Sequence, residues 1–204
     1  MNKKGLVFVL SGPSGSGKGT VLEEVLKTEK LYLSVSATSR RPREGEKDGV
    51  NYYFYTPERF SEIAAGGGFL EYTTTYGNFY GTPRQPILDA VERGENIMLE
   101  IDSVGAVNVK AEYPDAILIF LVTPNVAELK RRLIGRGTED PEQLKTRIDC
   151  YIDEIKAGLK YDYLVINDDV KRCAADVIAI IRAEQLKIKN NIGFINNFKG
   201  DNIC

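Results

Sequence analysis

A glycine-rich turn near the start of the chain has the residue types and spacing of a phosphate-binding loop. It reads GPSGSGKGT from Gly12 to Thr20 and directly follows the apolar run LVFVL at 6–10. Glycines permit positive φ angles and leave room for phosphate oxygens, so successive backbone N–H groups can converge on an anion. The helix expected at 18–27 adds its positive N-terminal end, and Lys18 adds a charge that can reach β- and γ-phosphates.

The alternative is an ordinary glycine-rich turn, which the strand, the helix and the lysine together disfavour. We therefore predict a nucleoside triphosphate site made of Gly12, Pro13, Ser14, Gly15, Ser16, Gly17, Lys18, Gly19 and Thr20. The residue after the lysine departs from the usual loop, which has Ser or Thr there to bind Mg²⁺. Here that residue is Gly19, so we expect no metal ligand at this position, with Thr20 as a doubtful contact. Mg²⁺ would be held mainly by phosphates and water, which suits its reluctance to dehydrate. The GKGT form resembles nucleoside monophosphate kinases, in which the phosphates of ATP and of a second nucleotide face each other.

A cluster of arginines predicts a second anion site. Arg40, Arg41 and Arg43 lie in SVSATSRRPREGEKDGVNYYF at 34–54 and are followed by tyrosines. Arginines on a loop can bind a phosphate through paired hydrogen bonds, although an isolated RRPR turn would more simply be a solvated basic loop. The order and spacing of this segment with FLEY (69–72), GNFYGTP (77–83) and LEID (99–102) closely resemble guanylate kinase, over roughly residues 4–187.

The resemblance implies an enzyme that uses ATP and Mg²⁺ to phosphorylate GMP, and dGMP as well, to the diphosphate. It implies a GMP site in which Glu71 and Thr82 contact the guanine and Asp102 also approaches the base. The site is further lined by Ser36, Arg40, Arg43, Tyr52 and Tyr80. Of these, the arginines and tyrosines are expected to contact the phosphate. A carboxylate such as Glu71 can accept from both N1–H and the 2-amino group of guanine. Adenine lacks these donors, so AMP would leave the carboxylate unpaired.

Simpler roles exist for both carboxylates: Glu71 could be a surface acid at a strand end, and Asp102 a helix cap or a salt-bridge partner. One departure from the family is IDSVGA at 101–106, where many members have glutamine in place of Val104. Valine cannot form that residue's hydrogen bonds, and we expect local repacking with activity retained.

Further arginines match the mobile lid of the family and the helix that follows it. Arg132 and Arg136 are four residues apart, so they share one helix face and can point together at phosphates, and Arg147 follows. Such charges can stabilise a phosphoryl group in transfer, and no general base is needed because the acceptor is already a phosphate oxygen. The alternative is that they pair with nearby acids, namely Glu139, Asp140 and Glu142.

The segment VINDD at 165–169 resembles the adenine-side loop of the family, with Asn167 and Asp168 as expected ATP contacts. Asp168 or Asp169 could instead, or in addition, cap the helix expected at 170–187. The pair Thr123–Pro124, which follows IFLV, is expected to start a helix.

The elements that position these residues indicate an α/β fold. Continuous apolar runs are typical of parallel strands covered on both faces, and they recur at 6–10, 96–101, 116–122 and 163–167. Segments with helical periodicity alternate with them, at 18–27, 83–93, 126–136, 141–157 and 170–187. This pattern predicts a P-loop-type parallel sheet flanked by helices. Residues 34–82 are expected to form an inserted GMP-binding lobe of mixed β structure, in which the alternating NYYFYT indicates short antiparallel strands.

We thus expect a core of 1–33 and 83–189, a small helical lid at about 135–147, and an Asn-rich tail at 190–204 that is frayed or packed on the core or a partner. The sequence has no membrane-length apolar run and no secretion signal. Its three cysteines are widely spaced and it has no histidine, which indicates reduced thiols and excludes His-based triads. The formal net charge of −2 gives no reason to expect nucleic-acid binding.

From these features we expect a cytoplasmic monomer or homodimer whose partners are ATP and GMP. The nearest rival is a kinase for AMP, UMP or dTMP, which the sequence of the inserted lobe disfavours. A second rival is a non-catalytic domain that binds peptides. Such guanylate-kinase-like domains usually have degraded P-loops, whereas this chain keeps Gly12, Gly17 and Lys18.

Overall fold

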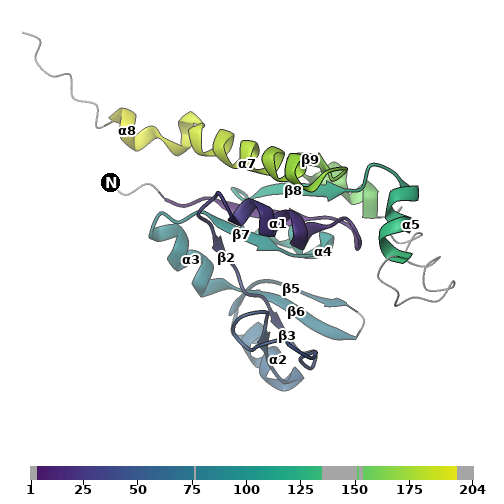
Figure 1. Ribbon diagram of the computed structural model, residues 1–204. Coiled ribbons are helices and arrows are strands. Elements are labelled where there is room, and N and C mark those ends of the chain that lie inside the picture. Colours follow the sequence, from purple (N-terminus) through teal and green to yellow (C-terminus); the bar gives the residue numbers. More distant parts are fainter. Residues whose placement is uncertain (1–3, 76, 135–150, 152–153, 197–204) are drawn as a thin grey trace, which may run out of the picture.

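The computed structural model (Figure 1) describes residues 4–75, 77–134, 151 and 154–196. Arg136, Arg147 and the lid expected at about 135–147 lie outside these residues, as does 197–204 of the expected tail.

The larger of two sheets is fully parallel and has five strands in the order β2-β7-β1-β8-β9. The strands are β1 (Val7–Ser11), β2 (Tyr32–Leu33), β7 (Ile97–Glu100), β8 (Ile117–Val122) and β9 (Tyr163–Ile166). Four of them match the predicted strands within one or two residues. The central strand β1 leads directly into the glycine-rich turn, so the predicted phosphate loop lies at the carboxyl edge of the sheet. This edge is where ligands bind in open α/β folds.

Helices cover both faces of this sheet (Figure 1). They are α1 (Lys18–Leu26), α3 (Arg84–Glu92), α4 (Ser103–Glu112) and α7 (Val170–Leu186). Helix α5 (Val126–Ile134) lies beyond the end of the sheet (Figure 1) and packs in a separate cluster with Tyr151. On one face α1 and α7 pack on alternate strand residues such as Phe8 and Leu10. On the other face α3 and α4 pack on the intervening residues such as Val7 and Val9. Burial on both faces explains why the three central strands, β1, β7 and β8, are continuously apolar.

The smaller sheet lies between β2 and α3 in the chain and has four strands in the order β4-β3-β6-β5. Its strands are β3 (Ala37–Thr38), β4 (Tyr53–Phe54), β5 (Phe69–Thr75) and β6 (Asn78–Pro83). Helix α2 (Pro57–Ala65) packs on it through the buried Phe60. The pairs β5–β6 and β3–β6 are antiparallel as expected, but β4 runs parallel to β3. The expectation of antiparallel pairing was wrong for NYYFYT, since the loop at 39–52 is long enough to return the chain to the same end of the sheet.

Three smaller differences concern helices. Helices α2 and α4 were not predicted, and α5 begins at Val126, where the Asn125 side chain accepts from the Glu128 N–H at 2.9 Å. Thr123–Pro124 therefore lies just before the helix, in the short loop that joins β8 to α5. After α7 the chain continues through two short helices, η2 (Ile188–Asn190) and α8 (Ile192–Asn196), and η1 (Gly158–Lys160) precedes β9. In the part of the chain that the structure describes, no helix could span a membrane.

Candidate active site

The glycine-rich loop between β1 and α1 has the geometry of an anion cradle. Gly15 and Gly17 have φ of 86° and 93°. A Cβ on Gly17 would lie 2.5 Å from Asn167 Nδ2, and one on Gly12 would lie 2.1 Å from the Leu121 carbonyl oxygen, so both positions need glycine. Helix α1 begins at Lys18 and has no side-chain cap. A helix N-terminus without a side-chain cap favours an anion, and the site predicted for this turn stays a prediction.

Lys18 curls back over the loop that precedes it. Its ammonium donates to the Gly12 carbonyl at 2.5 Å and lies 3.4 Å from the Pro13 carbonyl. The charge is therefore held beside the backbone N–H groups of the cradle, where the phosphates of a nucleotide would bind.

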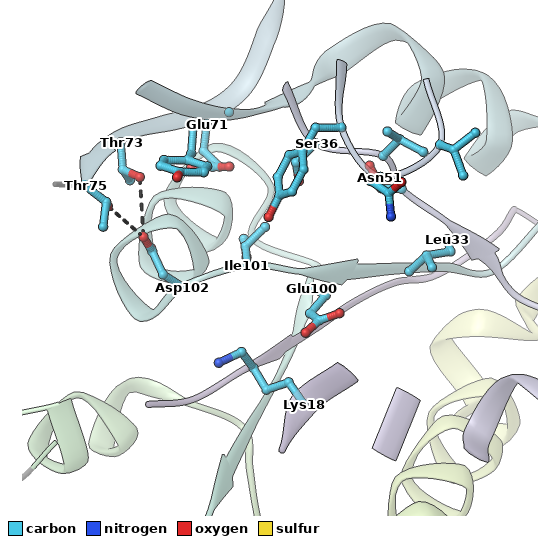
Figure 2. A pocket seen from close by; sticks show the side chains of 16 residues that line it. Lys18, Leu33, Ser36, Asn51, Glu71, Thr73, Thr75, Glu100, Ile101 and Asp102 are labelled. Atoms are coloured by element: carbon cyan, nitrogen blue, oxygen red, sulfur yellow. Dashed lines mark hydrogen bonds between the residues drawn. The ribbon is translucent and has the colours of Figure 1, made fainter. Parts of the chain in front are cut away.

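A cavity of about 390 Å³ opens beside Lys18, between the two sheets (Figure 2). Six of the predicted site residues line it: Lys18, Ser36, Tyr52, Glu71, Tyr80 and Asp102. Figure 2 shows Lys18 and Glu100 on one side of the cavity and Glu71 with Thr73 on the other. The remaining wall comes from Leu33, Ser34, Val35, Val50, Asn51, Thr75, Gly81 and Ile101. Its size is that of a small-molecule site.

The arginine loop is ordered by an acid that the sequence analysis did not select. Glu46 accepts two hydrogen bonds from the Arg40 guanidinium, both at 2.9 Å, and one from the Arg43 backbone N–H at 2.7 Å. These bonds hold the pKa of Glu46 below its ordinary value. The Arg40 guanidinium lies over the ring of Tyr52, 5.5 Å from its centroid, and Tyr52 contacts Tyr80 edge-on. The Arg43 residue is exposed on the same loop.

We expect Glu46→Ala to raise the KM for GMP by about tenfold with a smaller effect on kcat. The substitution removes the paired bonds that fix Arg40, a loss of about 1–2 kcal/mol in phosphate recognition. Steady-state kinetics with varied GMP measure it, and Glu44→Ala, which changes an exposed acid on the same loop, is the control. A wild-type KM in Glu46→Ala would mean that Arg40 keeps its position without this partner.

Glu71 is buried at the opposite end of the cavity, with 7% of its surface exposed. Its Oε1 accepts from the Thr82 hydroxyl at 2.7 Å, and Oε2 lies against Gly105, where a Cβ would come within 2.8 Å. Burial raises the pKa of Glu71 to about 7; the nearby charge of Asp102 adds to this and the Thr82 bond opposes it. The interpretation of Glu71 as a surface acid is therefore wrong.

Asp102 caps a helix and also lines the cavity. Its Oδ1 accepts from the Gly105 N–H at 2.7 Å and caps α4, which confirms the helix-cap alternative. Its Oδ2 lies 3.3 Å from the Thr75 hydroxyl and 3.5 Å from the Thr73 hydroxyl, and the residue lines the cavity. Val104, the second residue of α4, is 60% exposed. Valine in place of the glutamine of many family members therefore needs no change in the core.

Glu100 is a second acid that the sequence analysis missed. It lines the cavity at the end of β7, where the residue as a whole is exposed. Partial loss of water around its carboxylate raises its pKa, and the charge of Lys18 opposes the shift. A Cβ on Gly19 would lie 3.7 Å from Glu100 Oε1. The carboxylate thus faces the position where P-loops usually have a hydroxyl. The sequence feature that could have identified Glu100 is its position in LEID, two residues before the predicted site residue Asp102.

Asn167 and Arg132 form hydrogen bonds that hold the backbone of the glycine-rich loop. Asn167 is buried and donates through Nδ2 to the Ser16 carbonyl at 2.8 Å. Arg132 donates to the Ser16 carbonyl at 3.2 Å and to the Asn167 carbonyl at 2.7 Å, and its Nε pairs with Glu128 at 2.7 Å. The acid that pairs with Arg132 among the described residues is therefore on its own helix, one turn back.

Asp168 and Asp169 lie at the start of α7. Asp169 caps the helix by accepting from the Arg172 N–H at 2.9 Å, and Asp168 forms an ion pair with the Arg172 guanidinium. The capping role is confirmed for Asp169.

Comparison with known proteins identifies close relatives over most of the chain. The family model for guanylate kinase matches residues 4–184. A guanylate kinase of Clostridioides difficile (strain 630) is 47% identical over 187 residues, 91% of each chain. One of Clostridium acetobutylicum is 46% identical over 195 residues, 94% of this chain and 93% of that protein. A crystal structure of guanylate kinase from Anaplasma phagocytophilum is similar with a TM-score of 0.80 and 32% identity, covering 95% of this chain and 93% of that one.

Proposed function

The chain belongs to the guanylate kinase family, and from that premise we propose how its residues carry out the ATP-dependent phosphorylation of GMP to GDP. The observation that carries the assignment of roles is the cavity, which has the cation of Lys18 on one side and the buried carboxylate of Glu71 on the other. A nucleoside monophosphate has its phosphate and its base at opposite ends, so it can meet both groups at once.

In this proposal Glu71 and Asp102 recognise guanine. Glu71 accepts from N1–H and from one hydrogen of the 2-amino group. The second amino hydrogen needs another acceptor, and Asp102 lines the same cavity. Thr82, bonded to Glu71, orients the carboxylate. An adenine base would leave a buried carboxylate without donors, a cost of several kcal/mol that disfavours AMP.

The phosphate of GMP is assigned to the arginine loop. Arg40 and Arg43 supply positive charge and paired donors, and Tyr52 and Tyr80 supply hydroxyl groups from the cavity wall. Ser36 lines the cavity between the base and phosphate ends. This arrangement leaves a phosphate oxygen of GMP pointing toward Lys18, so the attacking atom needs no general base.

ATP is assigned to the cradle of residues 12–20. Lys18 and the backbone N–H groups neutralise the charge that shifts between the oxygens during transfer. Arg132 braces the loop at Ser16, and Arg136 and Arg147 complete the set of cations proposed for the transferring phosphoryl group. Asn167 and Asp168 are proposed to border the adenine.

Mg²⁺ is proposed as the cofactor that binds together with ATP. It would supply positive charge that offsets the charge of the phosphates. The residues present fit a metal held through water. Gly19 offers no hydroxyl, the Glu100 carboxylate faces it, and Thr20 lies exposed on the first turn of α1. Glu100 and Thr20 would accept from water molecules bound to the ion, which suits the reluctance of Mg²⁺ to lose them.

We further propose that residues 34–82 act as a GMP-binding unit on a core of 1–33 and 83–189, and that dGMP is also a substrate. Every contact proposed above goes to the base or the phosphate, so the loss of a ribose hydroxyl should be tolerated. A cytoplasmic monomer or homodimer, with ATP and GMP as its partners, remains the proposal for location and assembly.

A coupled assay of ADP release tests the function. With ATP and Mg²⁺, we expect ADP release with GMP and dGMP, and little with AMP, UMP or dTMP. Release of ADP without any acceptor would indicate an ATPase. No release with any acceptor would favour the non-catalytic peptide-binding alternative.

A further inference from the structure

Two threonines of β5 lie beside the carboxylate of Asp102 (Figure 2). Asp102 Oδ2 is 3.3 Å from the Thr75 hydroxyl and 3.5 Å from the Thr73 hydroxyl. Both threonines line the cavity with Asp102. They come from the smaller sheet, whereas Asp102 follows β7 of the larger sheet. These contacts are therefore formed only when the two sheets are in place.

Side chains of β5 alternate between the two faces of the strand, so not all of its threonines face the cavity. Side chains two residues apart point to the same face of a strand, and the one between them points to the other. Thr74 accordingly is exposed, while Thr73 and Thr75 are half-buried against the cavity. A general preference of threonine for strands applies to all three residues and does not explain the contact with Asp102.

The contacts complete the anchoring of the carboxylate. The Gly105 N–H holds Oδ1 at 2.7 Å, and this single bond leaves the carboxylate free to swing about the bond to its own carbon chain. Hydroxyl donors on Oδ2 restrict that rotation. A carboxylate offers about four acceptor positions, so three bonds still leave room for a donor from a ligand. Threonine suits the task because its branched Cβ keeps χ1 nearly fixed.

We propose that Thr73 and Thr75 are positioning residues that aim Asp102 at the 2-amino group of the purine substrate, and so contribute to the preference for guanine. The proposal rests on the proposed function, in which Asp102 accepts from that amino group. Nothing in it requires either threonine to touch the phosphates or the reacting atoms.

The test compares GMP with IMP, which keeps the N1–H of the base and lacks its 2-amino group. In Thr73→Val/Thr75→Val, a near-isosteric change to another strand-favouring residue, the KM for GMP should rise by about five- to tenfold, as expected from the loss of two weak hydrogen bonds. The kcat for GMP should stay within about twofold. The dissociation constant of IMP, measured by calorimetry, should not change, because IMP offers Asp102 nothing to accept.

Two control variants separate positioning from folding. Thr74→Val changes the exposed threonine of the same strand and should behave as wild type. Thr73→Ser/Thr75→Ser keeps both hydroxyls and should retain the low KM. If the double valine variant fails to fold, Thr75→Val alone, which removes the shorter contact, is measured in the same way.

Equal weakening of GMP and IMP, or no change in either, would overturn the proposal. Equal weakening would indicate a general role in shaping the cavity. These outcomes are distinct from a failure of the proposed function, which would already be evident as an absence of GMP-dependent turnover in the wild-type enzyme.

Discussion

Replacing Lys18 by methionine is expected to abolish turnover while GMP still binds. The ammonium lies over the cradle, 2.5 Å from the Gly12 carbonyl, on the side of the cavity away from Glu71. Methionine keeps the length and apolar stem of the side chain and removes the charge. Because the transition state moves charge onto oxygens beside that cation, we expect kcat to fall by at least about 10²–10³-fold.

Binding of GMP should be affected far less, because Glu71, Asp102 and the arginine loop are unchanged. Calorimetry with GMP alone separates binding from catalysis, and a dissociation constant within a few-fold of wild type is expected. Lys27→Met is the matched control, since Lys27 directly follows the same helix and its side chain is 67% exposed. Wild-type-like turnover in Lys18→Met would contradict the assigned role of this residue.

The three central strands of the larger sheet, β1, β7 and β8, were predictable because they are covered on both faces. Burial on two sides leaves a continuous apolar run such as ILIFLV in β8, which needs no knowledge of partners to recognise. The pairing of β4 was not predictable in the same way. An alternating pattern such as NYYFYT specifies which side chains share a face, but it does not say in which direction the neighbouring strand runs.

The site was only partly predictable for a related reason. The cradle is contiguous in sequence, so its glycines and Lys18 could be interpreted together. Glu71 and Asp102 are far apart in the chain, and only the resemblance to a family suggested that they share a ligand. Nothing local distinguishes Glu71 from a surface acid, because its burial depends on α4 packing against β5.

The acids that sequence reasoning missed act on other residues. The role of Glu46 is evident only from the two hydrogen bonds that it accepts from Arg40, which form when the loop folds back on itself. Glu100 needed the approach of α1 to β7 before its position opposite Gly19 could be known. In both cases the informative feature is a tertiary contact, which a pattern along the chain does not contain.

Glu71→Gln is expected to remove most of the discrimination against AMP. The amide cannot accept from both N1–H and the 2-amino group as a carboxylate does, so two bonds to a charged acceptor are lost. At about 1.5–3 kcal/mol each, we expect kcat/KM for GMP to fall by roughly two to four orders of magnitude. Glu62→Gln, an exposed glutamate on α2, is the matched control. An unchanged preference for GMP over AMP would refute the assignment.

The same residue gives a pH dependence with a defined sign. In the free enzyme the pKa of Glu71 is about 7, mainly because of burial. The N1–H and 2-amino edge of guanine offers only donors, so GMP selects the ionised form of Glu71, and below this pH the carboxyl must first lose a proton. The kcat/KM for GMP should therefore rise about tenfold per pH unit up to about pH 7 and level off above it. In Glu71→Gln this slope should disappear.

Stability should change in the opposite direction to function. Because burial raises the pKa of Glu71 from 4.5 to about 7, the folded chain binds the proton more tightly than the unfolded chain does. This contribution to stability is fully present below pH 4.5 and is lost as the pH rises to about 7. Glu71→Gln has no charge to bury, so at pH 8 its free energy of unfolding should exceed that of wild type by up to about 3 kcal/mol. Urea unfolding at pH 5 and pH 8 measures the difference, which should shrink at the lower pH. A variant less stable than wild type at pH 8 would show that the buried carboxylate is stabilised by its surroundings, and it would remove the basis for the predicted pH dependence of GMP binding.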